Sequence, residues 1–132
     1  MNQRGFATLE IILAIVILSI IATIAVPRFT DTKTRANTAK IQADLSTIDT
    51  ALQIRYLEKG NWTGIDSVEN LVTEGYLMEE PKPPTGSAFM GGTSTEIDAT
   101  TTTYHIDTTN NQYRAALKMN SKANAHAGDF SK

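Results

Sequence analysis

The chain of 132 residues contains no cysteine, only four prolines and nearly balanced charges, with 12 Lys and Arg against 14 Asp and Glu. The lack of cysteine excludes disulfide bonds, thiolate zinc sites, iron–sulfur clusters and cysteine nucleophiles. The net charge of −2 gives no electrostatic reason to expect nucleic-acid binding. A chain of this length has room for one domain at most.

Apolar side chains are distributed very unevenly along the chain. Residues 6–26 hold 17 of them in 21 positions, whereas residues 27–132 hold 36 in 106 positions. As an α-helix the first stretch spans about 31 Å, which matches the hydrocarbon thickness of a bilayer. It is apolar on every face, so it is not an amphipathic surface helix. The second stretch can build only a small core.

Three ordinary explanations fit the apolar run: a membrane anchor, a cleaved secretory signal, or the buried helix of a soluble protein. A secretory signal would use Arg4 as its basic end and the stretch 23–25 as its small-residue cleavage site. The remaining chain is too small to cover a buried helix, which argues against the third explanation. Pro27 follows directly, and its missing backbone donor predicts that the helix kinks or ends there.

Glu10 fits none of these explanations. A carboxylate inside an apolar membrane helix costs on the order of 2.5–3.5 kcal/mol, and such a residue marks a functional position by default. It needs a cationic partner, and Arg4 lies outside the apolar run. A new α-amino group would serve if the chain were cut between Gly5 and Phe6, because glycine has no side chain to obstruct a peptidase.

The succession of Gly5, Phe6, Glu10, a long apolar run and Pro27 resembles the N-terminus of the type IV pilin and pseudopilin family. The resemblance implies that a leader peptide, residues 1–5, is removed by a prepilin peptidase and that the exposed Phe6 is N-methylated. It also implies that Glu10 pairs with the Phe6 amine of a neighbouring subunit during filament assembly.

Two positions depart from the family pattern. Ala7 stands where many members have threonine, and Ser19 stands where many have a glycine that loosens the helix. Neither departure affects the expected processing. The second bears on how readily the helix unwinds between Ser19 and Pro27 inside a filament.

The resemblance also implies an orientation and a set of partners. Charge alone favours a cytoplasmic head, because only Arg4 precedes the apolar run and the following basic residues are Arg28, Lys33, Arg35 and Lys40. The family instead implies a cytoplasmic leader and a single pass through the cytoplasmic membrane. The head is then extracytoplasmic, and the assembled filament is extracellular or periplasmic.

The expected partners are other copies of the chain, membrane lipid before assembly, and the prepilin peptidase and methyltransferase. An assembly platform protein and ATPase act indirectly. The sequence does not separate a pilus from a type II secretion pseudopilus or a competence filament for DNA uptake. It also leaves open whether the subunit is a major or a minor component.

Residues 27–132 are predicted to form an amphipathic helix and a head. Apolar residues recur at helical spacing along one stripe: Ile41, Leu45, Ile48, Leu52 and Tyr56. Before this stripe, Thr34, Asn37 and Thr38 occupy the equivalent positions. That part of the helix is therefore expected to have no core of its own and to need a neighbouring molecule.

The rest of the head is predicted to contain a short helix and a small antiparallel sheet, giving an α+β, pilin-like fold. Asp66 or Ser67 is expected to cap the short helix, and Gly75 to end it. Residues 81–92 are expected to be irregular. Residues 100–117 are predicted to form a hairpin with its turn at 109–111, with a third strand near 96–99. The small, polar tail, residues 120–132, is expected to be mobile.

No catalytic, cofactor or metal site is predicted, so the chain is not expected to be an enzyme. His105 and His126 lack further convergent ligands, and His126 falls in the tail. Glu96, Asp98 and Asp107 could hold calcium, but a solvated acidic loop is the better interpretation. The alternative to a filament subunit is a membrane-anchored or secreted extracellular binding domain that does not polymerise. An extracellular enzyme would need a clustered polar site.

Overall fold

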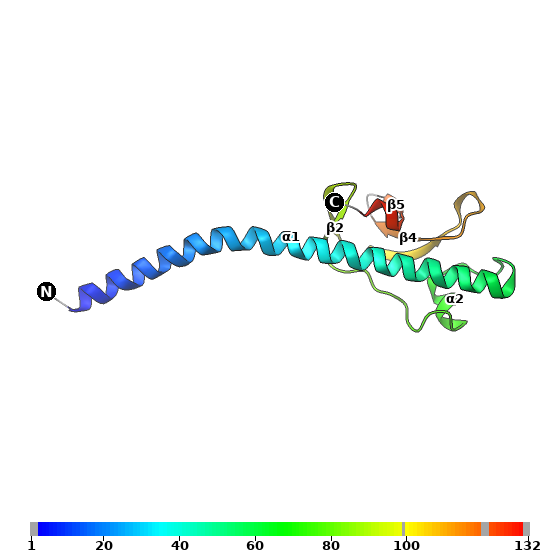
Figure 1. The fold of residues 1–132 in the computed structure, drawn as a ribbon, viewed down its shortest axis with the longest axis horizontal. Coiled ribbons are helices and arrows are strands. Elements are labelled where there is room, and N and C mark those ends of the chain that lie inside the picture. Colours follow the sequence, from blue (N-terminus) through cyan, green and yellow to red (C-terminus); the bar gives the residue numbers. More distant parts are fainter. Residues whose placement is uncertain (1–2, 99, 120–121, 131–132) are drawn as a thin grey trace. The chain divides into compact units, whose positions relative to one another are not determined.

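A computed structural model describes residues 3–98, 100–119 and 122–130. Its elements are α1 (Gln3–Lys59), α2 (Val68–Thr73), β1 (Gly86–Met90), β2 (Thr93–Ile97), β3 (Thr103–Asp107), β4 (Arg114–Met119) and β5 (Lys122–Ala125), with short 3₁₀ turns η1 (Thr109–Asn111) and η2 (Ala127–Asp129) (Figure 1). The predicted α+β fold, a long N-terminal helix with a small antiparallel head, is confirmed.

The chain divides into two compact units, Met1–Lys33 and Thr34–Lys132, which we call unit 1 and unit 2. Helix α1 begins in unit 1 and ends in unit 2. Unit 1 consists of helix only among its described residues. Unit 2 contains the remainder of α1 and every other element of the described chain.

Helix α1 continues through Pro27, so of the two predicted outcomes, a kink or an end, the helix does not end there. Proline removes a single backbone donor, and the flanking helical hydrogen bonds remain. A kink at Pro27 stays a prediction. Two polar residues of the apolar run are satisfied within their own helix: the Ser19 hydroxyl donates to the Ile15 carbonyl at 2.7 Å, and the Thr23 hydroxyl donates to the Ser19 carbonyl at 2.8 Å.

In unit 2 the predicted apolar stripe of α1 forms the centre of the core. Its first four members are buried completely or nearly so: Ile41, Leu45, Ile48 and Leu52. Tyr56, the fifth, is partly exposed and stacks on Trp62, with ring centroids 4.5 Å apart. Trp62 stacks in turn on Tyr113 at 4.8 Å, which ties the end of α1 to the residue before β4.

The polar residues that precede this stripe were expected to need a neighbouring molecule, and that expectation is wrong. Thr34, Asn37 and Thr38 are buried within the chain rather than left for a neighbouring molecule. The Asn37 amide donates to the carbonyls of Thr85 and Ser87 at 3.0 and 2.9 Å, and the Thr38 hydroxyl accepts from the Phe89 N–H at 2.7 Å. An edge strand presents unpaired backbone groups, and a polar helix face satisfies them where an apolar one could not.

Strands β1 and β2 form an antiparallel pair, so the expectation of irregular structure is wrong for residues 86–90. Gly91 and Gly92 make the tight turn with φ of 54° and 81°, a conformation that glycine adopts at little cost. Glu96 and Ile97 belong to β2 and pair with β1, not with the predicted hairpin. Ala99, included in that prediction, lies outside the described residues.

The predicted hairpin is confirmed as β3 and β4, with η1 at its turn and Tyr104 opposite Leu117. Its third strand is β5, giving the order β3-β4-β5. The predicted mobile tail is therefore wrong for residues 122–130, which form β5 and η2 and end on the buried Phe130. The Gln42 amide donates to the carbonyl of Phe130. Residues 120, 121, 131 and 132 lie outside the described residues.

The short helix α2 forms as predicted, with Ser67 as its N-cap. The Ser67 N–H donates to the Asn70 side-chain oxygen at 2.9 Å. Gly75 follows the helix with φ of +85°, which an L side chain rarely adopts. Leu71 and Leu77 are buried in the core beside the stripe of α1.

Candidate assembly surface

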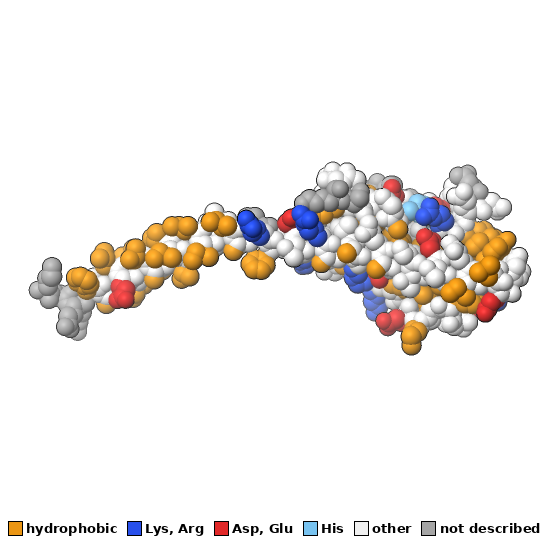
Figure 2. Space-filling model, in the orientation of Figure 1, with side chains coloured by type: hydrophobic (Ala, Val, Ile, Leu, Met, Phe, Trp, Pro, Cys, Tyr) orange, Lys and Arg blue, Asp and Glu red, His pale blue; other side chains and the backbone are white. Residues whose placement is uncertain are grey.

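The apolar side chains of unit 1 stand exposed all around the helix. Phe6 is 69 % exposed and Phe29 is 74 % exposed, and the large apolar residues between them are all about half exposed or more. An 18-residue window of this segment has a mean hydropathy of 2.9 and is not buried at all. Figure 2 shows apolar side chains along the visible face of unit 1. Among the described residues, α1 is the one helix long and apolar enough to cross a membrane.

Glu10 is exposed on this apolar surface. It is the only charged residue between Phe6 and Val26. Phe6 and Glu10 are four residues apart in α1, so they lie on the same face of the helix, one turn from each other. The packing of a membrane helix does not require a carboxylate, so its presence in an otherwise apolar segment indicates a functional position.

Gly5 lies inside α1, directly before Phe6. Apart from its chain neighbours and the backbone of its own helix, a Cβ atom built on Gly5 would meet no atom of the described chain within 4 Å. The structure thus places Gly5, Phe6 and Glu10 within two turns of one helix and leaves Phe6 and Glu10 exposed. Cleavage at Gly5, methylation of Phe6 and pairing of Glu10 stay predictions.

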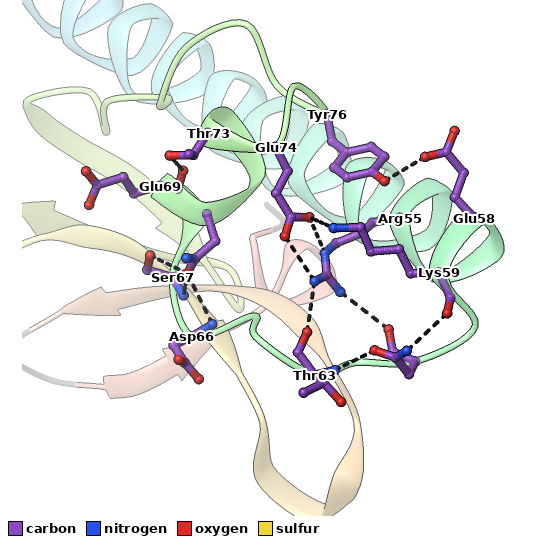
Figure 3. A network of polar contacts seen from close by, with 12 residues as sticks. Arg55, Glu58, Lys59, Thr63, Asp66, Ser67, Glu69, Thr73, Glu74 and Tyr76 are labelled. Carbon is purple, nitrogen blue, oxygen red and sulfur yellow. Dashed lines mark hydrogen bonds and ion pairs between the residues drawn. The ribbon is translucent and has the colours of Figure 1, made fainter.

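The head contains a polar cluster that the sequence analysis missed (Figure 3). Arg55 is only 2 % exposed, and its guanidinium donates to the Thr63 carbonyl at 2.9 Å and to Glu74 Oε1 at 3.1 Å. Lys59 lies 2.9 Å from Glu74 Oε2. Hydrogen bonds from Arg55 and then from Lys59 lower the pKa of Glu74 to about 2, and the Glu74 hydrogen bond raises the pKa of Arg55.

This cluster has a structural role: it ties α1 to the loop after it and to the end of α2. The sequence did contain a signal for it. Arg55 follows Leu52 by three residues and therefore falls on the buried face of α1. A charged residue on a core-facing stripe requires polar partners, and the acidic residue at the end of α2, Glu74, supplies one.

The acidic residues considered for calcium mostly serve local turns. Asp98 Oδ1 accepts from the Thr100 N–H at 2.9 Å, and Asp107 Oδ1 accepts from the Thr109 N–H at the same distance. Among residues 3–98, 100–119 and 122–130, no three His, Asp or Glu side chains come together as a metal-binding group. His126 does not lie in a loose tail; it follows β5 and contacts β3 and β4.

Comparison with known proteins places the chain in a family. It is 32 % identical over 82 residues to the type II secretion system core protein G of Pectobacterium carotovorum, an alignment that covers 61 % of this chain and 53 % of that protein. It is 31 % identical over 102 residues to the core protein G of Klebsiella pneumoniae, covering 67 % of this chain and 73 % of that protein. The chain belongs to the type IV pilin and pseudopilin family.

Another relative within this family is a pilus protein. The type IV narrow pilus major component PilA5 of Thermus thermophilus is 30 % identical over 102 residues, covering 77 % of this chain and 78 % of that protein. No family model and no solved structure matches the chain. The family resemblance inferred from the N-terminal residues is confirmed.

Proposed function

We propose that the chain is a structural subunit of a filament of the type IV pilus or type II secretion pseudopilus kind, and not an enzyme. It is made as a prepilin, cut between Gly5 and Phe6, and N-methylated at Phe6. In the filament, Glu10 of one subunit pairs with the Phe6 amine of a neighbouring subunit. The names of its relatives cover both kinds of filament, so the proposal includes both.

The observation that carries this proposal is the exposed apolar helix of unit 1. In water such a surface would be strongly unfavourable, since each Å² of exposed apolar area costs about 25 cal/mol relative to burial. Membrane lipid can cover it before assembly, and neighbouring copies of the same helix can cover it afterwards. Lipid tails are as apolar as leucine, so assembly depends on side-chain packing and polar pairing rather than on hydrophobic transfer.

Glu10 provides such a polar pairing. In the low-dielectric interior of a helix bundle, a carboxylate without a cation is costly, and a well-placed ammonium group offsets that cost. Because residues 6–26 carry one carboxylate and cleavage would give them one amine, the pair forms only at one axial offset between neighbouring subunits. The pair therefore selects the register of assembly against other offsets.

The proposed location follows from the same processing. The chain enters the cytoplasmic membrane with residues 1–5 on the cytoplasmic side, where the prepilin peptidase and methyltransferase act, and with the head extracytoplasmic. An assembly platform protein and its ATPase then drive incorporation into an extracellular or periplasmic filament. Residues 27–132 form the amphipathic half of α1 and the head, which lies on the outer surface of the filament.

Mass spectrometry of the native protein tests the processing step. Intact mass and N-terminal peptides are measured on chain extracted from its own membrane. The expected chain begins at Phe6 and carries one additional methyl group. A chain beginning at Met1 would overturn the prepilin pathway, and a chain cut near Ala25 would indicate an ordinary secreted domain.

A further inference from the structure

We propose that the outer end of the membrane helix binds the anionic headgroups of membrane phospholipids through Arg28 and Lys33, with Phe29 as an anchor at the membrane surface. We call these three residues the juxtamembrane belt. All three belong to unit 1 and follow the apolar run that ends at Val26. The inference rests on the membrane-inserted stage of the proposed function and does not depend on filament assembly.

The position of the belt along α1 places it at the depth of the headgroups. A helix rises about 1.5 Å per residue, so the Cα atoms of Arg28 and Phe29 lie about 3 and 4.5 Å beyond the end of the apolar run. The headgroup region on each side of the hydrocarbon core is about 5–8 Å thick. The Cα atom of Lys33 lies about 10 Å beyond the run. Helical side chains tilt towards the N-terminus, so the long Lys33 side chain reaches back towards the membrane.

The two basic side chains of the belt are available for headgroups. Arg28 and Lys33 are both exposed, and neither side chain has a hydrogen-bond or ion-pair partner among the residues that the structure describes. Lys40, further along α1, differs from them, because its ammonium pairs with Asp44 and donates to the carbonyl of Lys82 at 2.9 Å. Guanidinium and ammonium groups form charge-assisted hydrogen bonds with phosphate oxygens.

The distribution of charge concentrates the attraction to an anionic surface beside the membrane helix. Residues 28–40 contain four basic residues and one acidic residue, a net charge of +3. Residues 41–132 contain seven basic and twelve acidic residues, a net charge of −5. An anionic membrane surface therefore attracts the segment that contains the belt and repels the rest of the head. Each basic residue near such a surface strengthens binding about fivefold.

Phe29 adds an apolar contact at the same depth. Its side chain is 74 % exposed, although it lies outside the apolar run that requires lipid. Helices at membrane surfaces place phenylalanine in the boundary between headgroups and acyl chains. Phe29 and Lys33 are four residues apart and share one face of α1, so the ring and the ammonium can contact neighbouring parts of one lipid.

Headgroup binding also explains a conflict in the charge pattern. The proposed orientation puts the belt on the extracytoplasmic side, where the positive-inside rule disfavours basic residues. Figure 2 shows Lys and Arg side chains where the apolar stretch of unit 1 ends. Binding to anionic lipid gives Arg28 and Lys33 a function on that side of the membrane while the subunit awaits assembly.

Electron paramagnetic resonance of spin-labelled lipids tests the inference on the full chain. The chain is reconstituted in phosphatidylcholine vesicles that contain traces of spin-labelled phosphatidylglycerol or of spin-labelled phosphatidylcholine with the same acyl chains. The fraction of each labelled lipid immobilised by the protein is compared. We expect a preference of about threefold or more for phosphatidylglycerol at about 0.01 M salt. The preference should largely disappear at about 1 M salt, where the screening length falls to about 3 Å.

A pair of double variants locates the preference on the chain. Arg28→Gln combined with Lys33→Gln should remove most of it. Arg114→Gln combined with Lys118→Gln is the matched control, because it removes one arginine and one lysine from exposed positions in the head, and it should keep the preference of the parent. Arg4 is unchanged in both double variants, so the comparison between them isolates the belt.

Each outcome bears on the inference. Equal immobilisation of both lipids by the parent at low salt, a preference that persists in the belt variant, or an equal loss in the control would overturn it. The salt series uses the unaltered chain and decides the question even if a variant fails to fold. Immobilisation of neither lipid would mean that the chain does not insert, which would also contradict the proposed function. Insertion without a preference would overturn the inference and leave the filament proposal in place.

Discussion

The two units of the chain use apolar side chains in opposite ways. In unit 1 the leucines, isoleucines and valines are exposed around a single helix, whereas in unit 2 most residues of the same types are buried between α1, α2 and the two sheets. Unit 2 therefore buries most of its large apolar side chains within a single chain. Unit 1 requires apolar surroundings from outside the chain, either lipid or further copies of itself. Unit 2 is thus the part that folds around its own core, and unit 1 is the part available for contacts with lipid or other chains.

Polar residues follow the same division. Thr38 and Asn37 in unit 2 bond to the backbone of β1, and Arg55 bonds to Glu74. In unit 1 the hydroxyl of Ser19 bonds within its own helix. Glu10 has the one charged side chain of the apolar run, and the filament proposal gives it a partner on another chain. Each unit can be disturbed separately, which makes the comparison testable.

The largest effect is expected from Glu10→Leu. The substitution should abolish filaments, or reduce them by more than tenfold, because it removes the charge that selects the register between subunits. Membrane insertion should be retained, since leucine is more favourable in lipid than glutamate. Sheared-filament yield and the membrane fraction are measured side by side.

Ser19→Ala is the matched control for this experiment, because it removes another polar group from the same apolar run. Ser19 donates only within its own helix, so the variant should assemble normally. Filaments of normal yield from Glu10→Leu, or equal losses from both variants, would mean that the charge of Glu10 has no part in assembly.

In unit 2 the largest effect is expected from Leu45→Ala. Leu45 is completely buried, and such truncations lower the free energy of unfolding by about 2–5 kcal/mol. Leu57, on the same helix, is 82 % exposed, so Leu57→Ala should change it by no more than about 0.5 kcal/mol. Denaturant unfolding of the full chain in detergent is followed by the fluorescence of Trp62, the only tryptophan. Equal effects of the two variants would contradict the assignment of the core.

An intermediate effect is expected from Thr38→Val. The substitution keeps the side-chain shape and removes the hydroxyl that accepts from the Phe89 N–H, a hydrogen bond whose loss costs about 0.5–1.5 kcal/mol. Thr50→Val is the control, because the Thr50 hydroxyl is exposed and donates only to Ser46 in its own helix. The same unfolding measurement distinguishes the two. If Thr38→Val were as stable as Thr50→Val, the polar face of α1 would not hold β1.

The smallest effect is a pH dependence that comes from Glu74. Its pKa is lowered from 4.5 to about 2, so its contribution to stability is fully present above pH 4.5 and is lost as the pH falls towards 2. The difference in unfolding temperature between the parent and Glu74→Gln should therefore be largest above pH 4.5 and should shrink towards pH 2. Glu79→Gln, in an exposed loop, should follow the parent throughout. A constant difference between the parent and Glu74→Gln would contradict the ion pair with Arg55.

Local patterns in the sequence predicted some parts of this structure well. The stripe from Ile41 to Leu52 has helical period, and alternating residues around Tyr104 and Ala115 have the period of strands, so both could be read directly. The N-terminal features also identified the family. Each of these signals lies within one contiguous segment.

The errors concern contacts between distant segments. The sequence does not reveal strand β1, because its partner on α1 is the polar pair Asn37 and Thr38, which resembles a surface without a core. The small, polar composition of the tail predicts mobility, although a single anchor, Phe130, is buried in the core. Asp107 and His126 meet only because β5 folds back onto β4.

Helical reconstruction of filaments purified from the native cell tests the central claim most directly. The account predicts that the helices beginning at Phe6 pack against one another in the filament interior, with each Glu10 carboxylate within hydrogen-bonding distance of a neighbour's N-terminal nitrogen. The heads of unit 2 should lie outside and keep the fold of the single chain. A filament whose interior excludes the apolar helix of unit 1, or in which Glu10 faces solvent, would contradict it.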